Sequence, residues 1–407
     1  MKKFIFIMLL GLLWSSCSNE EGIIPPSSPE KAASELRTPE EAIALADNLF
    51  ASRTEGTRAS SRTVKAVSII GSASGRSASD TLIYAINYAD NGGFALVSAV
   101  PEGIDIIGYA DEGNFDVEKI EPGSNVEYFL DAAKNYVSAR GISIGDGPII
   151  NPGNDPIYKW DRIKPVLAVE WGQNYPEGIY CPNKIAGCVQ TAMAQMMSFL
   201  QAPTSISLTY TNHDIATQTL NWAEITKHTK SCSNAESTVN SHLSSCKATL
   251  ESHKALGRLC RELGHRNHAN YYEDATGAYT YRAYNTFTTL CPSKSFVAYK
   301  SFNSDFSNLY SDLKAKSGIA YVDGGDKGGA GAHAWVCDGG EDMQKITRYL
   351  KYDGTYEDHV EHNYCYHFNW GWNGLYNGYF NAGVFDTSKG RSRYDFSISP
   401  GFFVVYK

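Results

Sequence analysis

The sequence predicts an α+β protein in which a small α+β domain precedes a larger domain with helices first and antiparallel strands later. Three observations carry this prediction. Two helix starts with capping boxes enclose several strand patterns before residue 141. A stretch rich in Gly, Asp, Asn and Pro follows, and an apolar helix then precedes several alternating aromatic strands. At 407 residues the chain is also too long for one typical hydrophobic core.

The N-terminal residues have the composition of a targeting signal followed by a tether. Two lysines precede the apolar stretch 4–14, which is too short to span a bilayer. Cys17 follows two serines, as at a bacterial lipoprotein cleavage site, so we expect a lipoprotein-type signal peptide over 1–17. An ordinary signal peptide with an incidental Cys17 is the alternative. Residues 18–35 have the composition of a flexible tether.

The small α+β domain is expected over residues 36–141. Thr38, Pro39 and Glu41 supply a capping box for a helix that reaches about residue 51. A second capping box, Ser124–Glu127, begins a helix that ends at residue 141. The strand patterns between these helices cover 64–70, 82–88, 94–97 and 104–109.

Residues 142–157 have linker chemistry and should be open to proteolysis, so the larger domain is expected over 158–407. The net charge is −8 and no long basic run is present, which argues against a nucleic-acid partner.

Nine cysteines are present, and setting aside Cys17 and Cys188 leaves an odd seven that cannot all pair within the chain. Cys232 and Cys246 lie in a polar segment and could form a bridge. Cys337 and Cys365 lie in strand-like runs and are expected to be buried; spacing alone leaves the disulfide connectivity open.

Cys188 opens the apolar stretch 188–200, which has helical periodicity and ends before Pro203. A thiol in the first turn of a helix lies near a partial positive charge, which favours the thiolate. Gly187, just before it, leaves room for a substrate backbone. The alternative is a small buried cysteine without chemistry.

Three further residues complete a catalytic set in chain order. His333 heads a short apolar strand and could take the proton of the Cys188 thiol. Asn369 could bond the far ring nitrogen of that histidine, with Trp370 covering the bond. The side-chain amide of Gln173 could bind a tetrahedral oxyanion. A polar loop histidine and an aromatic core strand are the alternatives.

These residues stand in motifs that resemble the streptopain family of papain-like cysteine peptidases over about residues 160–407: Trp171-Gly172-Gln173, Gly187-Cys188-Val189, His333-Ala334-Trp335 and Asn369-Trp370-Gly371-Trp372. Residues 36–141 resemble that family's inhibitory propeptide domain. The resemblance implies a papain-like fold, with a helical half and an antiparallel β half, and a secreted zymogen. Its folded prodomain would mask the cleft until the linker is cleaved.

The resemblance also implies the site roles: Cys188 as nucleophile, His333 as base, Gln173 at the oxyanion, and Asn369 and Trp370 in support of the histidine. Ala278 and Ala332 would line substrate subsites by position, although the family pattern has serine and glycine there.

The sequence therefore predicts an exported cysteine endopeptidase that acts on proteins or peptides without a metal or organic cofactor. It would lie on the outer membrane or cell surface, or be secreted after processing, and only a lipid on Cys17 would hold it to a membrane. A catalytically silent surface lipoprotein that binds protein ligands is the first alternative, and acyl transfer by the same pair is the second.

Two other patterns carry less weight. The histidine pairs His265/His268 and His359/His362 lack a convincing third ligand, so a solvated surface is favoured. The glycine-rich run 324–331 lacks the ending of a phosphate loop and is expected to be a mobile flap beside His333.

Overall fold

The computed structural model describes residues 36–53, 62–71, 81–101, 103–140, 157–230, 247–301, 307–325, 333–350, 355–385 and 398–407. The expected signal peptide and tether, most of the glycine-rich flap and nearly all of the linker lie outside these ranges, as do Cys17, Cys232, Cys246 and Ala332. The first two residues of the flap, Gly324 and Gly325, are described and end a strand. Residues 36–407 form one compact unit. No helix within the described ranges is both long and apolar enough to cross a bilayer.

Eleven strands of the described ranges form one sheet, and every pairing in it is antiparallel. These strands are β1 (Val64–Gly71), β2 (Thr81–Tyr88), β3 (Phe94–Ser98), β4 (Ile106–Ala110), β5 (Ile157–Ile163), β10 (Ser295–Ser301), β11 (Ile319–Gly325), β12 (His333–Leu350), β13 (Tyr356–Asn369), β14 (Gly378–Asn381) and β15 (Ile398–Tyr406). Their order is β1-β2-β3-β4-β14-β13-β12-β11-β15-β10, and β5 pairs with β12. Two small ribbons pair β6 (Ser205–Ser207) with β7 (Thr217–Thr219) and β8 (Asn270–Tyr271) with β9 (Thr276–Gly277).

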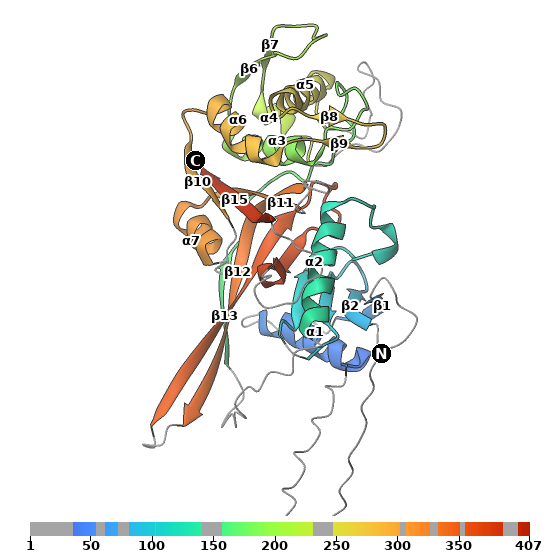
Figure 1. The fold of residues 1–407 in the computed structure, drawn as a ribbon, viewed down its shortest axis with the longest axis vertical. Helices are drawn as coiled ribbons and strands as arrows, with labels where there is room; N and C mark the ends of the chain where they lie inside the picture. Colours follow the sequence, from blue (N-terminus) through green and yellow to red (C-terminus); the bar gives the residue numbers. More distant parts are fainter. Residues whose placement is uncertain are drawn as a thin grey trace, which may run out of the picture. The chain divides into compact units, whose positions relative to one another are not determined.

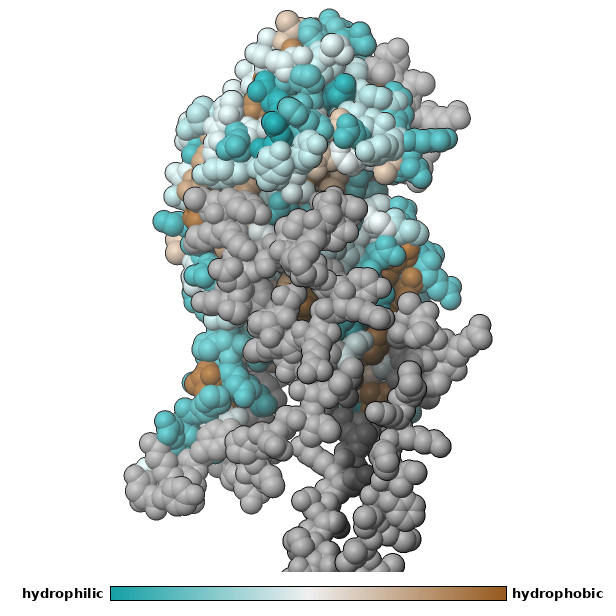
Figure 2. All heavy atoms as spheres, in the orientation of Figure 1, coloured by the Kyte–Doolittle hydropathy of each residue, from teal (hydrophilic) through white to brown (hydrophobic). Residues whose placement is uncertain are grey.

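The helices within the same ranges are α1 (Pro39–Arg53), α2 (Asn125–Arg140), α3 (Cys188–Leu200), α4 (Trp222–Ile225), α5 (Leu250–Arg266), α6 (Ala283–Leu290) and α7 (Ser307–Lys316), with short 3₁₀ turns η2 (Val117–Lys119), η3 (Thr280–Arg282) and η4 (Ala382–Phe385). Helices α3, α5 and α6 lie together beyond one end of the sheet, and α1 and α2 lie beside β1 and β2 (Figure 1). The surface over the α3–α6 region is mostly hydrophilic in Figure 2, with scattered apolar residues. This arrangement confirms the α+β class.

The predicted capping box at Thr38 is present in full, and the one at Ser124 is present in part, because its glutamate bonds the preceding residue. The Thr38 hydroxyl accepts from the Glu41 backbone N–H at 3.3 Å, and the Glu41 carboxylate accepts from the Thr38 N–H at 2.8 Å. At α2 the Ser124 hydroxyl accepts from the Glu127 N–H at 3.2 Å, while the Glu127 carboxylate bonds the N–H of Gly123. These bonds satisfy N–H groups that have no partner inside the helix, which fixes where both helices begin.

The expected prodomain strands join the sheet of the larger domain. Tyr109 and Gly108 of β4 pair with Tyr379 and Phe380 of β14. A Cβ at Gly108 would lie 2.6 Å from a ring carbon of Phe380, so glycine is needed for this close approach. The two regions therefore share one continuous sheet.

Strand residues alternate between two cores, one on each face of the sheet. On β12, Trp335 and Cys337 lie in the core that includes α2, whereas Ala334 and Val336 lie in the core that includes α3. Residues of β11 and β15 alternate in the same way. The helix of the small domain and the helix of Cys188 therefore cover opposite faces of these strands.

Two features of the β half differ from the expectation. The strand that begins at His333 runs for 18 residues and forms a long hairpin with β13 (Figure 1). Residues 340–346 of β12 also pair with β5, the first described strand after the linker. Cys337 and Cys365 are buried in this hairpin, as predicted.

Candidate active site

Cys188 is the first residue of α3, as the sequence predicts. Gly187 caps the helix with a φ of 93° and makes no side-chain capping bond. A Cβ at that position would lie 3.0 Å from the carbonyl oxygen of Thr276. Glycine therefore suits this turn on two grounds, its left-handed backbone and its close neighbour. The thiol is left at the positive end of a helix that is otherwise almost wholly buried.

Burial nevertheless raises the pKa of the Cys188 thiol above its usual value. Hydrogen bonds from the backbone of Ala334 and Val189 act in the opposite direction, and the nearby carboxylate of Asp323 raises the pKa further. In this state the thiol is protonated at neutral pH. The contact with Ala334 places the sulfur beside the strand that begins with His333.

His333 lies against the small domain. Its ring is 5.7 Å from the ring of Tyr128 on α2, on the same face as Trp335. Burial lowers the pKa of His333 to about 4, so the imidazole is neutral at pH 7. Among the described residues, no hydrogen bond or ion pair joins His333 to Cys188. The expected thiol–imidazole contact is absent because His333 lies on the α2 side of β12, whereas Cys188 lies on the α3 side.

Asn369 also departs from its expected contact. Its amide donates to the carbonyl of Val169 at 2.9 Å, and its oxygen accepts from the N–H of Gly371 at 3.2 Å. Asn369 pairs with Val336 across β12 and β13, so its side chain lies on the α3 face, away from His333. The hydrogen bond to His333 is therefore not formed in this structure.

Trp370 is fully buried and packs in the core beneath α2. Its indole N–H donates to the carbonyl of Tyr376 at 3.0 Å. Its ring centroid lies 5.4 Å from that of Trp335 and 5.9 Å from that of Phe129, a residue of α2. Instead of covering a bond between His333 and an amide, Trp370 packs against the small domain.

Gln173 lies on a segment that contacts α3 directly. Its backbone carbonyl accepts from the N–H of Ala186 at 2.7 Å, two residues before Cys188. The preceding carbonyl, of Gly172, accepts from the Thr191 hydroxyl at 3.2 Å. The structure therefore brings the segment of Gln173 to the helix that carries the thiol, as the sequence predicts.

Of the two expected subsite residues, Ala278 lies within the described ranges and Ala332 lies outside them. Ala278 is partly buried against the same core as Cys188. Thr276, two residues earlier, donates to the carbonyl of Ile185 at 2.8 Å. The segment that leads to Ala278 is therefore bonded, through Thr276, to the turn that precedes the thiol.

Two residues of α2 touch the site and were missed by sequence reasoning. The buried amide of Asn125 donates to the carbonyls of Ala334 at 2.9 Å and Trp370 at 2.8 Å. Tyr128 packs against His333 and also comes close to Gly324, the residue of β11 that pairs with His333. In sequence both are ordinary residues of an amphipathic helix, and no local pattern marks them.

Gln195 was missed as well, although it carried a signal. It is fully buried on α3, and its amide oxygen accepts from the N–H of Trp171 at 3.0 Å. An amide within the apolar run Met193–Met197 requires a buried hydrogen-bond partner, so the pattern itself could have pointed to one.

The histidine pairs are exposed on the surface. His265 and His268 lie at and after the end of α5, and His359 and His362 lie on β13, a strand instead of a helix turn. Within the described ranges, no three His, Cys, Asp or Glu side chains are arranged to hold a metal ion.

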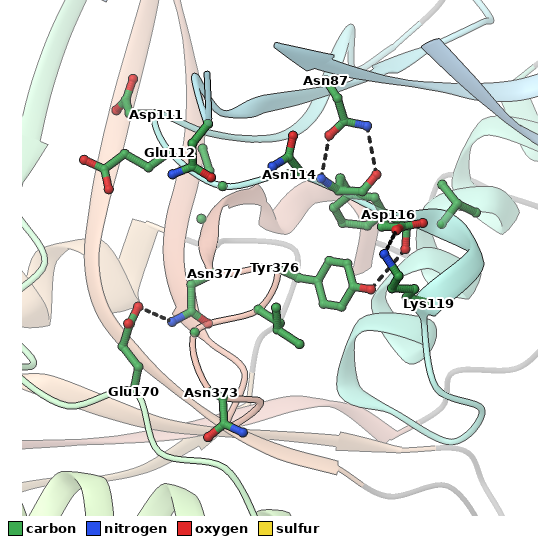
Figure 3. A pocket seen from close by; sticks show the side chains of 18 of the residues that line it. Asn87, Asp111, Glu112, Asn114, Asp116, Lys119, Glu170, Asn373, Tyr376 and Asn377 are labelled. Carbon is green, nitrogen blue, oxygen red and sulfur yellow. Dashed lines mark hydrogen bonds and ion pairs between the residues drawn. The ribbon is translucent and has the colours of Figure 1, made fainter. Parts of the chain in front are cut away.

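A cavity of about 990 Å³ opens on the other side of the Gln173 segment. It is lined by the turn 373–379, by Glu170 and by loop 110–119 of the small domain, and Figure 3 shows the bond between Asn377 and Glu170. Neither Cys188 nor His333 lines this cavity, so it is separate from the thiol site.

Comparisons with known proteins agree with this architecture. The family model described as Peptidase C10 family matches residues 170–380, and the model described as Spi protease inhibitor matches residues 34–137. The chain is 25% identical to the thiol protease/hemagglutinin PrtT of Porphyromonas gingivalis, over 77% of this chain and 36% of that protein. It therefore spans about a third of that relative's length.

The fold is similar to a solved fragment of prointerpain A from Prevotella intermedia, with a TM-score of 0.52 and 17% identity. The match covers 83% of this chain and 98% of that one. Since the first family model matches more than half of the sequence, the chain belongs to the peptidase C10, or streptopain, family and carries an N-terminal propeptide domain.

Proposed function

We propose that this protein is a cysteine endopeptidase, made as a zymogen, that hydrolyses peptide bonds through a thioester on Cys188. The observation that carries the proposal is the position of Cys188: first in α3, after a glycine cap, and beside the segment of Gln173. The family match and the thiol-protease relative support the same reaction class.

The proposed reaction uses four groups of the chain, after His333 has moved to Cys188. The Cys188 sulfur attacks the peptide carbonyl carbon, and the thiol proton passes to the imidazole of His333. The Gln173 amide and the Cys188 N–H stabilise the oxyanion. The C–N bond then breaks as the proton moves to the leaving amine. Water attacks the thioester, its proton returns through His333 to the sulfur, and the acid leaves.

The described conformation supports a latent state. His333 must leave the α2 face before it can reach Cys188, and Asn125 and Tyr128 hold that face. The thiol keeps its proton and the imidazole is neutral, so no thiolate–imidazolium pair has formed in this conformation. We therefore propose that the prodomain, residues 36–141, inhibits the peptidase until the linker 142–157 is cut.

The test compares the full chain with its Cys188→Ala variant. We expect the full chain to process itself, to hydrolyse a protein substrate and to be labelled by a thiol-directed peptidyl inhibitor. Cys188→Ala should do none of these. N-terminal sequencing of the processed species should find a new terminus within 142–157. Binding of protein ligands by both forms without turnover would instead favour the silent lipoprotein, and amine incorporation without hydrolysis would favour acyl transfer.

We also propose export with a lipid on Cys17. Cys17 follows the apolar stretch of the N-terminus at the position that a lipoprotein signal requires. Metabolic labelling with a radioactive fatty acid should mark the full chain and not Cys17→Ala. Equal labelling of both forms would contradict the anchor and leave the peptidase proposal untouched.

A further inference from the structure

The segment Val169–Gln173 is fixed at every residue by a hydrogen bond to another part of the chain. The partners come from α3, from the last residue of β13, and from the backbone at residues 186 and 229. The bonds are Asn369 amide to Val169 carbonyl, Glu170 N–H to Thr229 carbonyl, Trp171 N–H to Gln195 oxygen, Thr191 hydroxyl to Gly172 carbonyl, and Ala186 N–H to Gln173 carbonyl.

Two of these bonds come from the helix that carries the nucleophile. Cys188, Thr191 and Gln195 stand three and seven residues apart, so they share one face of α3. That face presents the thiol at its start, then the Thr191 hydroxyl, then the Gln195 amide. Gln195 has no solvent exposure, so its bond to the Trp171 N–H at 3.0 Å is shielded from competing water.

On its opposite side, beside the cavity, the segment is bonded to the turn after β13. The Asn377 amide donates to the Glu170 carboxylate at 3.1 Å, which Figure 3 shows. A Cβ on Gly172 would lie 2.7 Å from the side-chain oxygen of Asn373, so the absence of a side chain at Gly172 lets this turn approach the segment closely. The segment is therefore bonded to α3 on one side and to this turn on the other.

We propose that Gln195 is a positioning residue that holds the oxyanion-binding segment in register with Cys188. This inference rests on the proposed function, since it assigns Gln195 to the same reaction. Oxyanion donors act only when they are held in place before the charge develops. Through the Trp171 N–H, the Gln195 oxygen sets the distance between α3 and the Gln173 amide, with Thr191 as the second tie.

The test uses two equal substitutions on one helix. Gln195→Met removes the acceptor with little change in volume. Gln190→Met makes the same change at a buried glutamine whose amide atoms have no hydrogen-bond partner in the described part of the chain. Each protein is matured from the full chain, and peptide hydrolysis, affinity for a peptide aldehyde and alkylation of Cys188 by iodoacetamide are measured.

For Gln195→Met we expect kcat to fall about 10–100-fold, while KM stays within threefold of the wild-type value. This fall is smaller than the one caused by removing an oxyanion donor itself, because the donor is misplaced and not lost. The aldehyde forms an oxyanion with Cys188, so its affinity should fall by a similar factor. Alkylation forms none, so its rate should stay within twofold. Gln190→Met should match the wild type, and Gln195→Glu, which keeps an acceptor oxygen, should restore most of the loss.

Unchanged kcat and aldehyde affinity in Gln195→Met would overturn the positioning role while the peptidase remains established. An equal fall in the alkylation rate would also overturn it, because the thiol itself would then be disturbed. If Gln195→Met does not fold, Thr191→Val can be used instead, because it removes the hydrogen bond from the Thr191 hydroxyl to the Gly172 carbonyl with little change in shape. The same three measurements then test the positioning role. A wild type that neither hydrolyses peptides nor is alkylated would refute the proposed function, and this role with it.

Discussion

Two buried glutamines on α3 show how differently one residue type can act within a single helix. The Gln195 oxygen accepts a backbone N–H, whereas both amide atoms of Gln190 lack a partner within the described ranges. Gln190 is packed between Gly187 and Gly264, with no solvent exposure. An unpaired buried amide lowers stability, because it has lost its bonds to water.

Gln190→Met should therefore raise the free energy of unfolding by about 1–3 kcal/mol, the cost of an unsatisfied buried polar group. Urea denaturation of the Cys188→Ala zymogen would measure this change without self-processing. Gln195→Met is the matched control and should lower stability, since it leaves the Trp171 N–H unpaired. A loss of equal size in both variants would contradict this account.

His333 makes the free energy of unfolding of the zymogen depend on pH. Its pKa is about 4 in the folded state, against about 6.5 in an unfolded chain. Between these values the native state binds fewer protons than the unfolded state, so stability is complete above about pH 6.5 and is lost as the pH falls toward 4. The difference corresponds to about 3 kcal/mol.

Between pH 7 and pH 4.5 we expect the unfolding free energy of the Cys188→Ala zymogen to fall by about 2–3 kcal/mol because of His333. A further His333→Asn change should abolish this part of the fall. Other groups also titrate in this range, so the readout is the difference between the two proteins in urea denaturation at each pH. Parallel pH profiles would show that burial of His333 does not set this dependence.

At the scale of elements, the N-terminus of α2 is the main contact of the small domain with the site. The Asn125 amide ties the carbonyls of Ala334 and Trp370 to one helix end, and so links β12 to the end of β13. Tyr128 follows one turn later and covers His333. The capping box of Ser124 fixes the start of this helix, and so the positions of both side chains.

Asn125→Ala should speed self-processing of the full chain several-fold. It leaves two buried carbonyls without their donor, which weakens the docked state by about 1–3 kcal/mol. Ser138→Ala, an exposed change on the same helix, should process at the wild-type rate. The readout is the half-life of the full-length band at a fixed protein concentration. An unchanged half-life for Asn125→Ala would show that this bond pair does not restrain maturation.

At the scale of the whole molecule, a buried ion cluster joins the small domain to the sheet. Arg53, at the end of α1, binds both oxygens of Glu341 on β12, at 2.6 and 3.1 Å. The Tyr109 hydroxyl donates to the same carboxylate, and burial raises the Tyr109 pKa so that it remains a donor. Arg162, on β5, lies 3.6 Å away. The cluster adds to the β4–β14 pairing in holding the two regions together.

Arg53→Met should lower the unfolding free energy of the Cys188→Ala zymogen by about 3–5 kcal/mol, since it leaves Glu341 buried without its main partner. Lys119→Met breaks an exposed pair with Asp116 in the same domain and should leave the unfolding free energy almost unchanged, because solvent screens this pair. Thermal or urea unfolding would compare the two. Similar small losses would show that the cluster does not stabilise the docked state.

Local chemistry made much of this fold predictable. The capping boxes at Thr38 and Ser124, the strand patterns between them and the glycine before Cys188 depend only on near neighbours in the chain. The length of β12 was underestimated because its second half is polar and is stabilised by pairing with β5 and β13. That pairing leaves no periodic apolar signal in the sequence.

The sequence by itself determined which residues are available for chemistry and the helix end that carries Cys188, because residue type, spacing and capping are local. Only the tertiary structure decided that His333 and Asn369 occupy opposite faces, that α2 covers the histidine, and that Gln195 ties the Gln173 segment to α3. The side of a strand that a residue occupies depends on its pairing register. What covers it depends on contacts between residues that lie as far apart as Tyr128 and His333, and no local pattern encodes these.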